Sequence, residues 1–167
     1  MKQIVNEYEQ TPELLKNYYK LVSQSRFVFI GIVLVLFIAS FIINLINNSV
    51  ELVPTILGFA AFIILIGALI YNINKTAQIT YERIEEQTNG KKFKIKVIIK
   101  ENDINLSTNI KENDSNFKIE NIKKVKESKE LFVLITKTKL GIILKKDSFT
   151  KGNLEDLKQL IKQYKGR

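Results

Sequence analysis

The sequence contains no cysteine and no histidine among its 167 residues. These absences exclude thiol nucleophiles, thiol redox chemistry, disulfides, cysteine or histidine zinc sites and histidine general bases. Glycine is scarce as well, and none of the seven glycines falls in a dinucleotide-binding or Walker spacing. We therefore expect a protein that is not an enzyme and that uses neither a cofactor nor a metal ion.

Charge is missing from two long apolar runs, Phe27–Ile46 and Val53–Tyr71. A helix rises about 1.5 Å per residue, so roughly 20 apolar residues cross a hydrocarbon layer about 30 Å thick. The alternative is a pair of buried helices in a soluble bundle, but such helices keep a polar stripe that both runs lack. The sequence therefore predicts a transmembrane hairpin.

Basic residues predict how the hairpin is oriented. The formal net charge is +9, yet the short link at 47–52 carries Glu51 and no lysine or arginine. Lysines and arginines flank both runs on their other sides. Because basic flanks stay in the cytoplasm, both termini are predicted to be cytoplasmic in a bacterial inner membrane.

The composition along the chain predicts four parts. An N-terminal amphipathic helix lies within residues 1–26, the hairpin spans 27–71, a linker helix covers 72–90, and a small β domain fills 91–167. Residues 1–10 are expected to be irregular. The fold class is thus an α+β membrane protein.

The first helix has a clear start signal. Thr11 can cap it, Pro12 suits the first helical position, and Glu13 complements the helix dipole. Its apolar residues recur at helical spacing, so we expect a helix that lies at the membrane surface or runs directly into the first apolar run.

The C-terminal part shows the period of β-strands. Phe93, Ile95 and Val97 alternate with lysines, which places them on one face of a strand. The run Leu131–Ile135 is continuous and apolar, as in a central strand. A terminal helix capped by Asn153 closes a set of antiparallel strands.

Several features of this part occur together in one family: Phe117, Glu120 or Asn121 before Ile122, Leu131–Ile135, Lys145 and Lys146 with Phe149, and the amphipathic stretch Leu154–Ile161. In this order after a two-span hairpin, they resemble the YcxB-like bacterial membrane proteins. The resemblance implies a cytoplasmic domain similar to pleckstrin-homology (PH) folds, a strongly bent sheet capped by a C-terminal helix. It implies no catalytic residues.

The best functional candidates are the lysines that follow the second apolar run: Lys91, Lys92, Lys94 and Lys96. Lysine clusters beside a membrane attract anionic lipid, although a solvated strand face explains the same pattern. Nucleic acid is not an expected partner, because Phe93 should point into the core instead of stacking on bases.

Small residues in the second run recur seven apart and are candidates for helix–helix packing against the first run: Ala60, Ala61, Gly67 and Ala68. Ordinary membrane composition is the alternative explanation.

The leading functional hypothesis is a non-catalytic inner-membrane protein whose cytoplasmic domain binds a protein partner or anionic lipid headgroups. The alternative is an immunity or resistance protein that acts against a membrane-active or secreted bacterial toxin. A component of a transporter or secretion assembly is a third hypothesis. Expected partners are membrane lipids and a protein, with a homo-oligomer left open.

Overall fold

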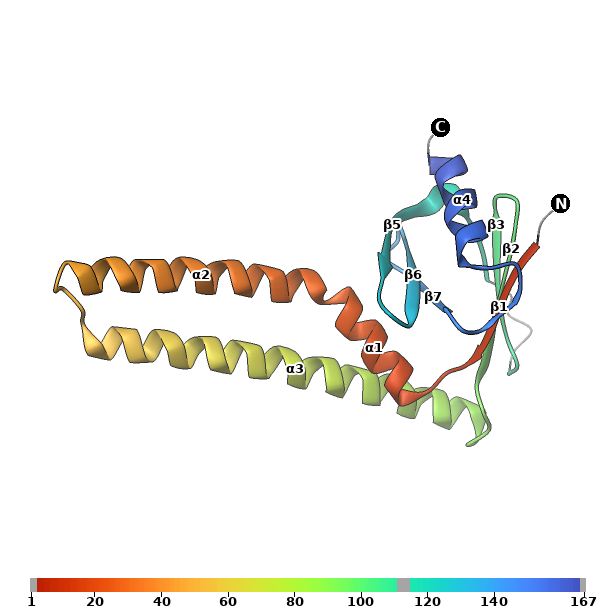
Figure 1. Cartoon of the computed structure of the whole chain (residues 1–167). Coiled ribbons are helices and arrows are strands. Elements are labelled where there is room, and N and C mark those ends of the chain that lie inside the picture. Colours follow the sequence, from red (N-terminus) through yellow and green to blue (C-terminus); the bar gives the residue numbers. More distant parts are fainter. Residues whose placement is uncertain (1–2, 111–114, 166–167) are drawn as a thin grey trace.

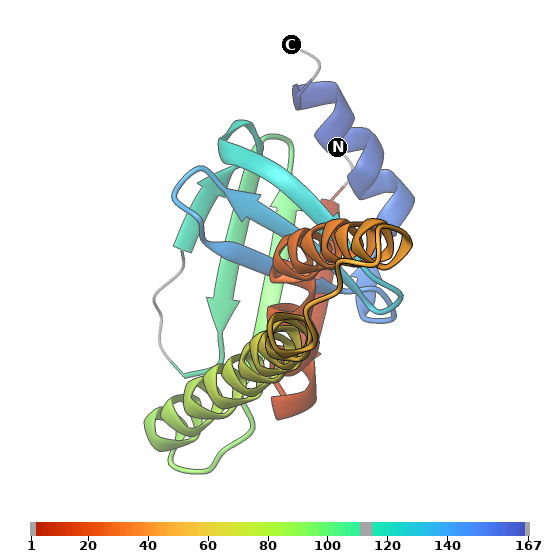
Figure 2. The same ribbon diagram turned by 90° about the vertical axis from the view of Figure 1, so that its left-hand side faces the viewer.

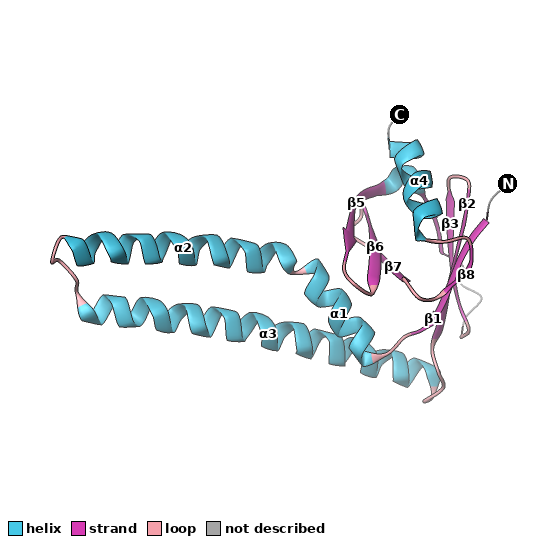
Figure 3. Cartoon of the chain, in the orientation of Figure 1, coloured by secondary structure: helices cyan, strands magenta, loops and turns pink. Residues whose placement is uncertain are grey.

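The computed structural model describes residues 3–110 and 115–165 and has an α+β architecture. A long helical hairpin projects from a β domain (Figure 1), and all the strands lie at one end of the molecule, with α1 and α4 beside them (Figure 3). The helices are α1 (Pro12–Val22), α2 (Gln24–Ile46), α3 (Leu52–Thr88), the short 3-10 helix η1 (Ile119–Asn121) and α4 (Leu154–Lys165). The strands are β1 (Gln3–Glu9), β2 (Lys94–Lys100), β3 (Asp103–Thr108), β4 (Ser115–Lys118), β5 (Ile122–Glu127), β6 (Leu131–Thr136), β7 (Gly141–Lys145) and β8 (Phe149–Lys151).

Helices α2 and α3 are the two predicted apolar runs. Both are long and apolar enough to cross a membrane, judged by length and composition. None of the most apolar 18-residue stretch of α2 is buried within the molecule, and only 6% of that of α3 is. The core helix of a soluble protein would be mostly buried, so these two helices do not have that role here.

Residues 1–10 were expected to be irregular, and that expectation is wrong for the segment that forms β1. This strand pairs antiparallel with β2 over its whole length and with β8 on its other side, in a sheet of order β4-β3-β2-β1-β8. Ile4 and Tyr8 point into the core, and their burial holds β1 in the domain. The sheet therefore combines residues from both sides of the helical hairpin.

A second sheet of order β5-β6-β7 packs against the first, and the strands of the two sheets cross (Figure 2). Its middle strand, β6, is buried along its entire length, which confirms the predicted central strand at Leu131–Ile135. Asn6 joins the sheets although it is polar and fully buried. Its Nδ2 donates to the Lys145 carbonyl at 2.7 Å, and its Oδ1 accepts from the Lys145 amide at 3.0 Å.

Helix α1 begins as predicted, with the Thr11 hydroxyl accepting from the Leu14 amide at 3.2 Å and Pro12 at its first position. The apolar stripe of α1 is not available to a membrane surface, which was one of the two predicted locations of this helix. Instead it packs on the outer face of the second sheet, where Leu14 and Leu21 join a cluster with Val133 and other residues of β6 and β7. The reason is that β6 has apolar side chains on both faces and needs a cover on each.

Helix α3 continues far beyond its apolar run. The predicted linker helix is its direct extension as far as Thr88, and Asn89 and Gly90 form the turn that follows, with φ of 49° and 73°. The Tyr19 hydroxyl lies 3.0 Å from that of Thr80, which ties α1 to this extension.

The C-terminal helix closes the core as predicted. Asn153 Oδ1 accepts from the Asp156 amide at 2.9 Å, and Leu157 and Ile161 are buried against the sheets. Residues 111–114, in the polar segment between β3 and β4, lie outside the described residues.

Candidate functional site

The four candidate lysines lie at and just before the start of β2, the middle strand of the first sheet. Lys91 and Lys92 precede β2, while Lys94 and Lys96 point outward from it, and all four are exposed. Strand β1 sets carboxylates opposite them: Lys92 Nζ is 3.1 Å from Glu9, and Lys96 Nζ is 3.8 Å from Glu7. Much of the positive charge predicted here is therefore balanced by acidic side chains that sequence reasoning assigned to an irregular segment.

These lysines are also distant from the apolar run. Seventeen residues of continuous helix separate Tyr71 from Thr88, which at 1.5 Å per residue is about 25 Å. Nearness in sequence had placed Lys91 close to the end of the run. The extension of α3 instead carries the chain away from the apolar run before β2 begins (Figure 1).

Most of the small residues predicted to pack on the first run are not buried against α2. Ala61 and Ala68 are exposed, Ala60 is half-buried, and a Cβ on Gly67 would meet no atom within 4 Å. The close approach is made by Gly58, where a Cβ would collide with the Phe37 ring of α2. The prediction of packing on α2 is thus wrong for Gly67, because the contact face of α3 is set by Gly58.

A second region, the elbow between α1 and α2, brings functional groups together. Helix α1 ends at Val22, Ser23 breaks the helix, and α2 begins at Gln24. Lys126 of β5 reaches this break, with Nζ donating to the carbonyls of Leu21 at 2.9 Å and Val22 at 2.8 Å. A cation suits the partial negative charge at the end of a helix, so Lys126 holds the elbow on the second sheet. Desolvation, followed by repulsion from Lys124, lowers the pKa of Lys126.

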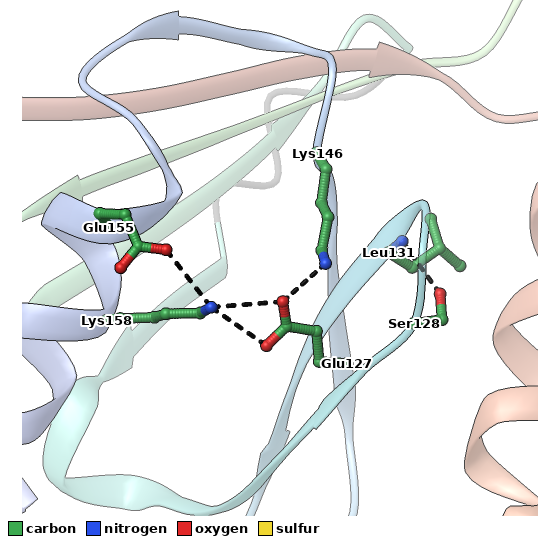
Figure 4. A network of polar contacts seen from close by, with 6 residues as sticks. All are labelled: Glu127, Ser128, Leu131, Lys146, Glu155 and Lys158. Atoms are coloured by element: carbon green, nitrogen blue, oxygen red, sulfur yellow. Dashed lines mark hydrogen bonds and ion pairs between the residues drawn. The ribbon is translucent and has the colours of Figure 1, made fainter.

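Glu127, the residue after Lys126, anchors the turn between β5 and β6, which faces the elbow (Figure 4). Glu127 Oε1 lies 2.6 Å from Lys146 Nζ, and Glu127 Oε2 lies 3.3 Å from Lys158 Nζ of α4. The bond from Lys146, and then that from Lys158, lowers the pKa of Glu127. The Ser128 hydroxyl accepts from the Leu131 amide at 3.1 Å and closes the β5–β6 turn. The turn that faces the elbow is therefore held by Lys146, which follows β7, by α4 and by its own main chain.

A cavity of about 520 Å³ lies between the elbow and this turn. Lys20 and Lys129 are exposed at its wall, and neither has a hydrogen bond or ion pair in the part of the chain that the structure describes. Glu130, also at the wall, accepts from Asn17 Nδ2 at 3.0 Å. The complete lining is Asn17, Lys20, Leu21, Gln24, Phe27, Glu127, Ser128, Lys129 and Glu130.

Across α2, a groove of about 430 Å³ contains Arg26 and Asn72 at one end and the apolar Phe29, Ile30, Leu65 and Leu69. Arg26 and Phe27 are consecutive, so the groove and the cavity open at the same level of α2. Three cations, Lys20, Arg26 and Lys129, therefore surround the point where the apolar run begins. Sequence reasoning missed Lys129 because it lies about a hundred positions from the elbow along the chain.

The side chains at the elbow are suited to binding a ligand. Lysine ammonium groups bind anions, and Phe27 and Leu21 offer apolar contact beside them. Over residues 3–110 and 115–165, no three acidic side chains gather in a way that could hold a metal ion.

The β5–β6 turn, the buried strand β6 and the terminal helix together carry the pattern that resembled a known family. Residues 101–161 match the family model of YcxB-like proteins. No curated protein and no solved structure matches the chain. The YcxB-like segment supplies the Glu127 network and the Lys126 cap, whereas β1, the elbow and both apolar helices lie outside it.

Proposed function

We propose that this chain is a non-catalytic integral membrane protein whose hairpin crosses the bacterial inner membrane and whose β domain binds anionic lipid headgroups or a protein partner at the cytoplasmic surface. One observation carries the proposal: the apolar stretches of α2 and α3 are almost entirely unburied within the molecule. Exposed apolar surface on this scale needs an apolar environment, and two helices of 23 and 37 residues are long enough to reach through a bilayer.

The proposed domain is PH-like. Support comes from its two packed antiparallel sheets, β4-β3-β2-β1-β8 and β5-β6-β7, and from a C-terminal helix that covers the core. In this reading the helical hairpin is inserted between two neighbouring strands of the domain. The amide of Gln10 still donates to the Phe93 carbonyl at 2.8 Å, so the ends of β1 and β2 meet despite the insertion.

The proposed orientation follows from the same arrangement. Strand β1 and helix α4 both belong to the domain, so both ends of the described chain lie on one side of the hairpin (Figure 1). The turn between α2 and α3 carries no basic residue, whereas Lys20, Arg26 and Lys75 lie at the domain end. Basic flanks stay in the cytoplasm, which favours a cytoplasmic domain.

Anionic lipid is the binding partner that the charge distribution favours. At physiological salt, charges separated by more than about 8 Å of solvent are largely screened. Lys91 to Lys96 follow the far end of α3 and are too distant to act on a surface at the Tyr71 level, whereas the elbow cations lie at that level. The proposed contact with lipid headgroups therefore moves from the lysines of β2 to the elbow.

The absence of cysteine makes a direct test straightforward, because any introduced thiol is unique. Ser49→Cys in the helix turn and Gln159→Cys on the exposed face of α4 are compared in intact cells with a membrane-impermeant maleimide. We expect labelling of Cys at 49 only, with labelling at 159 after the membrane is permeabilised, and retention of the chain in membranes washed with alkaline carbonate. Release of the chain into the carbonate supernatant would refute the proposal.

A further inference from the structure

The elbow cavity has the features of a site for a single lipid headgroup. We propose that it binds the phosphate of one anionic phospholipid, with Lys20 and Lys129 as the phosphate ligands. The assignment rests on the proposed insertion of the hairpin and specifies which surface meets the lipid. Nothing in the YcxB-like match itself marks this cavity, since half of its wall comes from α1 and α2.

The position of the cavity along α2 matches the level of a headgroup. Phe27, the first residue of the apolar run, lies in the wall of the cavity, and the polar Gln24 lies in the wall one turn earlier. If the run occupies the hydrocarbon layer, this transition is the boundary between acyl chains and headgroups. A phosphate in the cavity would therefore leave its acyl chains beside Phe27 and the rest of α2.

The charge of the cavity favours an anion. Its wall contains two lysines and two glutamates, but the glutamates already have partners in the fold. Glu127 is bound by Lys146 and Lys158, and Glu130 accepts from Asn17. Lys20 and Lys129 have no such partner among the residues that the structure places. Two ammonium groups are thus available for a phosphate, with the Gln24 amide and the Ser128 hydroxyl nearby.

The cavity is also held in shape before any ligand binds. Lys126 fixes the break between α1 and α2 through its two hydrogen bonds, and the Glu127 network fixes the β5–β6 turn on the other side of the cavity. Its volume of about 520 Å³ is within the usual range of small-molecule sites, which is about 300–1,000 Å³. A fixed cavity of this size suits one headgroup with its glycerol better than a diffuse layer of counterions.

The test measures lipid retention by the full chain in detergent with native mass spectrometry. Dioleoylphosphatidylglycerol is the anionic probe, and dioleoylphosphatidylcholine is the zwitterionic comparison. The site variant is Lys20→Gln with Lys129→Gln. The matched control is Lys92→Gln with Lys94→Gln, which removes the same charge from exposed positions beyond the end of α3, whose last residue lies about 25 Å from Tyr71. All four lysines are exposed, so both variants should fold, and a thermal melt checks this.

We expect one phosphatidylglycerol to be retained by the parent chain. The site variant should bind it about 25-fold more weakly, since each of the two lysines contributes about fivefold. The control should stay within about twofold of the parent. Equal losses in the two variants would show that net charge alone is responsible, and no loss in the site variant would remove the assignment altogether.

Free phosphate is separated from lipid by a competition arm. Glycerol 3-phosphate carries the same phosphate without acyl chains, so it should displace phosphatidylglycerol only weakly. Displacement as effective as that by the lipid would overturn the choice of a lipid ligand. Carbonate extraction of the same variants distinguishes the two proposals: a site variant that stays in the membrane but keeps its lipid affinity contradicts only the cavity assignment.

Discussion

Strand β1 should decide whether the β domain folds at all. We propose a soluble variant in which a short glycine–serine linker replaces residues 25–72, joining Gln24 to Ile73. The join is short because Ser25 and Asn72 line the same groove. The variant keeps β1, α1 and the extension of α3, and its matched partner begins at Thr11 and so lacks only β1.

The expected loss follows from what β1 buries. Ile4 and Val5 are 2% and 5% exposed, and burying two such side chains contributes roughly 3–6 kcal/mol, to which Tyr8 adds. Removing β1 also unpairs β2 on one side and β8 entirely. Small domains have unfolding free energies of about 5–15 kcal/mol, so the loss is comparable with the whole stability.

A point substitution tests the same reasoning on a finer scale. Asn6→Ala leaves the amide of Lys145 without its side-chain partner, whereas the Lys145 carbonyl keeps the bond from the Ser148 amide at 3.1 Å. The unsatisfied amide costs about 1–3 kcal/mol. For a domain of about 100 residues this lowers the melting midpoint by roughly 4–12 °C.

The assay is a circular dichroism melt together with an amide correlation NMR spectrum. The variant with β1 should show dispersed resonances and a cooperative transition, whereas the partner without β1 should show neither. If the partner melts cooperatively within a few degrees of the variant that retains β1, the sheet does not depend on its N-terminal strand and the reasoning is wrong.

Two further predictions concern the hairpin and the Glu127 network. Gly58→Val should destabilise the full chain in detergent by about 1–3 kcal/mol because its side chain would meet Phe37, whereas Gly67→Val, with open space around it, should leave the melting midpoint unchanged. The pKa of Glu127 is lowered in the fold, so its carboxylate contributes stability above its ordinary pKa of about 4.3, and that stability is lost as the pH falls through the lowered value. Melts between pH 7 and pH 3 should therefore fall more steeply for the parent and for the control Glu120→Gln than for Glu127→Gln, and parallel curves would contradict this.

The parts of the fold that the sequence predicted are those with local signals. The two apolar runs, the capped start of α1 at Thr11 and the alternation of β2 each depend on residues within a few positions of one another. The same holds for the capped helix that begins after Asn153. Periodicity reports such elements because the helix and strand repeats are short.

The parts that the sequence did not predict depend on contacts between distant segments. Strand β1 was missed because its inward residues are Ile4, Asn6 and Tyr8, and the buried Asn6 interrupts the apolar alternation. The role of Asn6 is evident only from its hydrogen bonds with Lys145, which lies 139 positions away. The elbow site was missed for the same reason, because Lys20 and Lys129 line one cavity only after β6 has packed on α1.

These long-range contacts also determine how the hairpin and the domain move relative to each other. Helix α1 is fixed to β6 by its apolar stripe and to α3 by the pair of Tyr19 and Thr80. Lys126 then binds the last carbonyls of α1 at the point where α2 begins. A tilt of α2 must therefore either break these two hydrogen bonds or carry the β5–β6 turn with it. Because Glu127 binds this turn to Lys146, just after β7, and to α4, the second course moves the domain as a whole and keeps the elbow cavity intact.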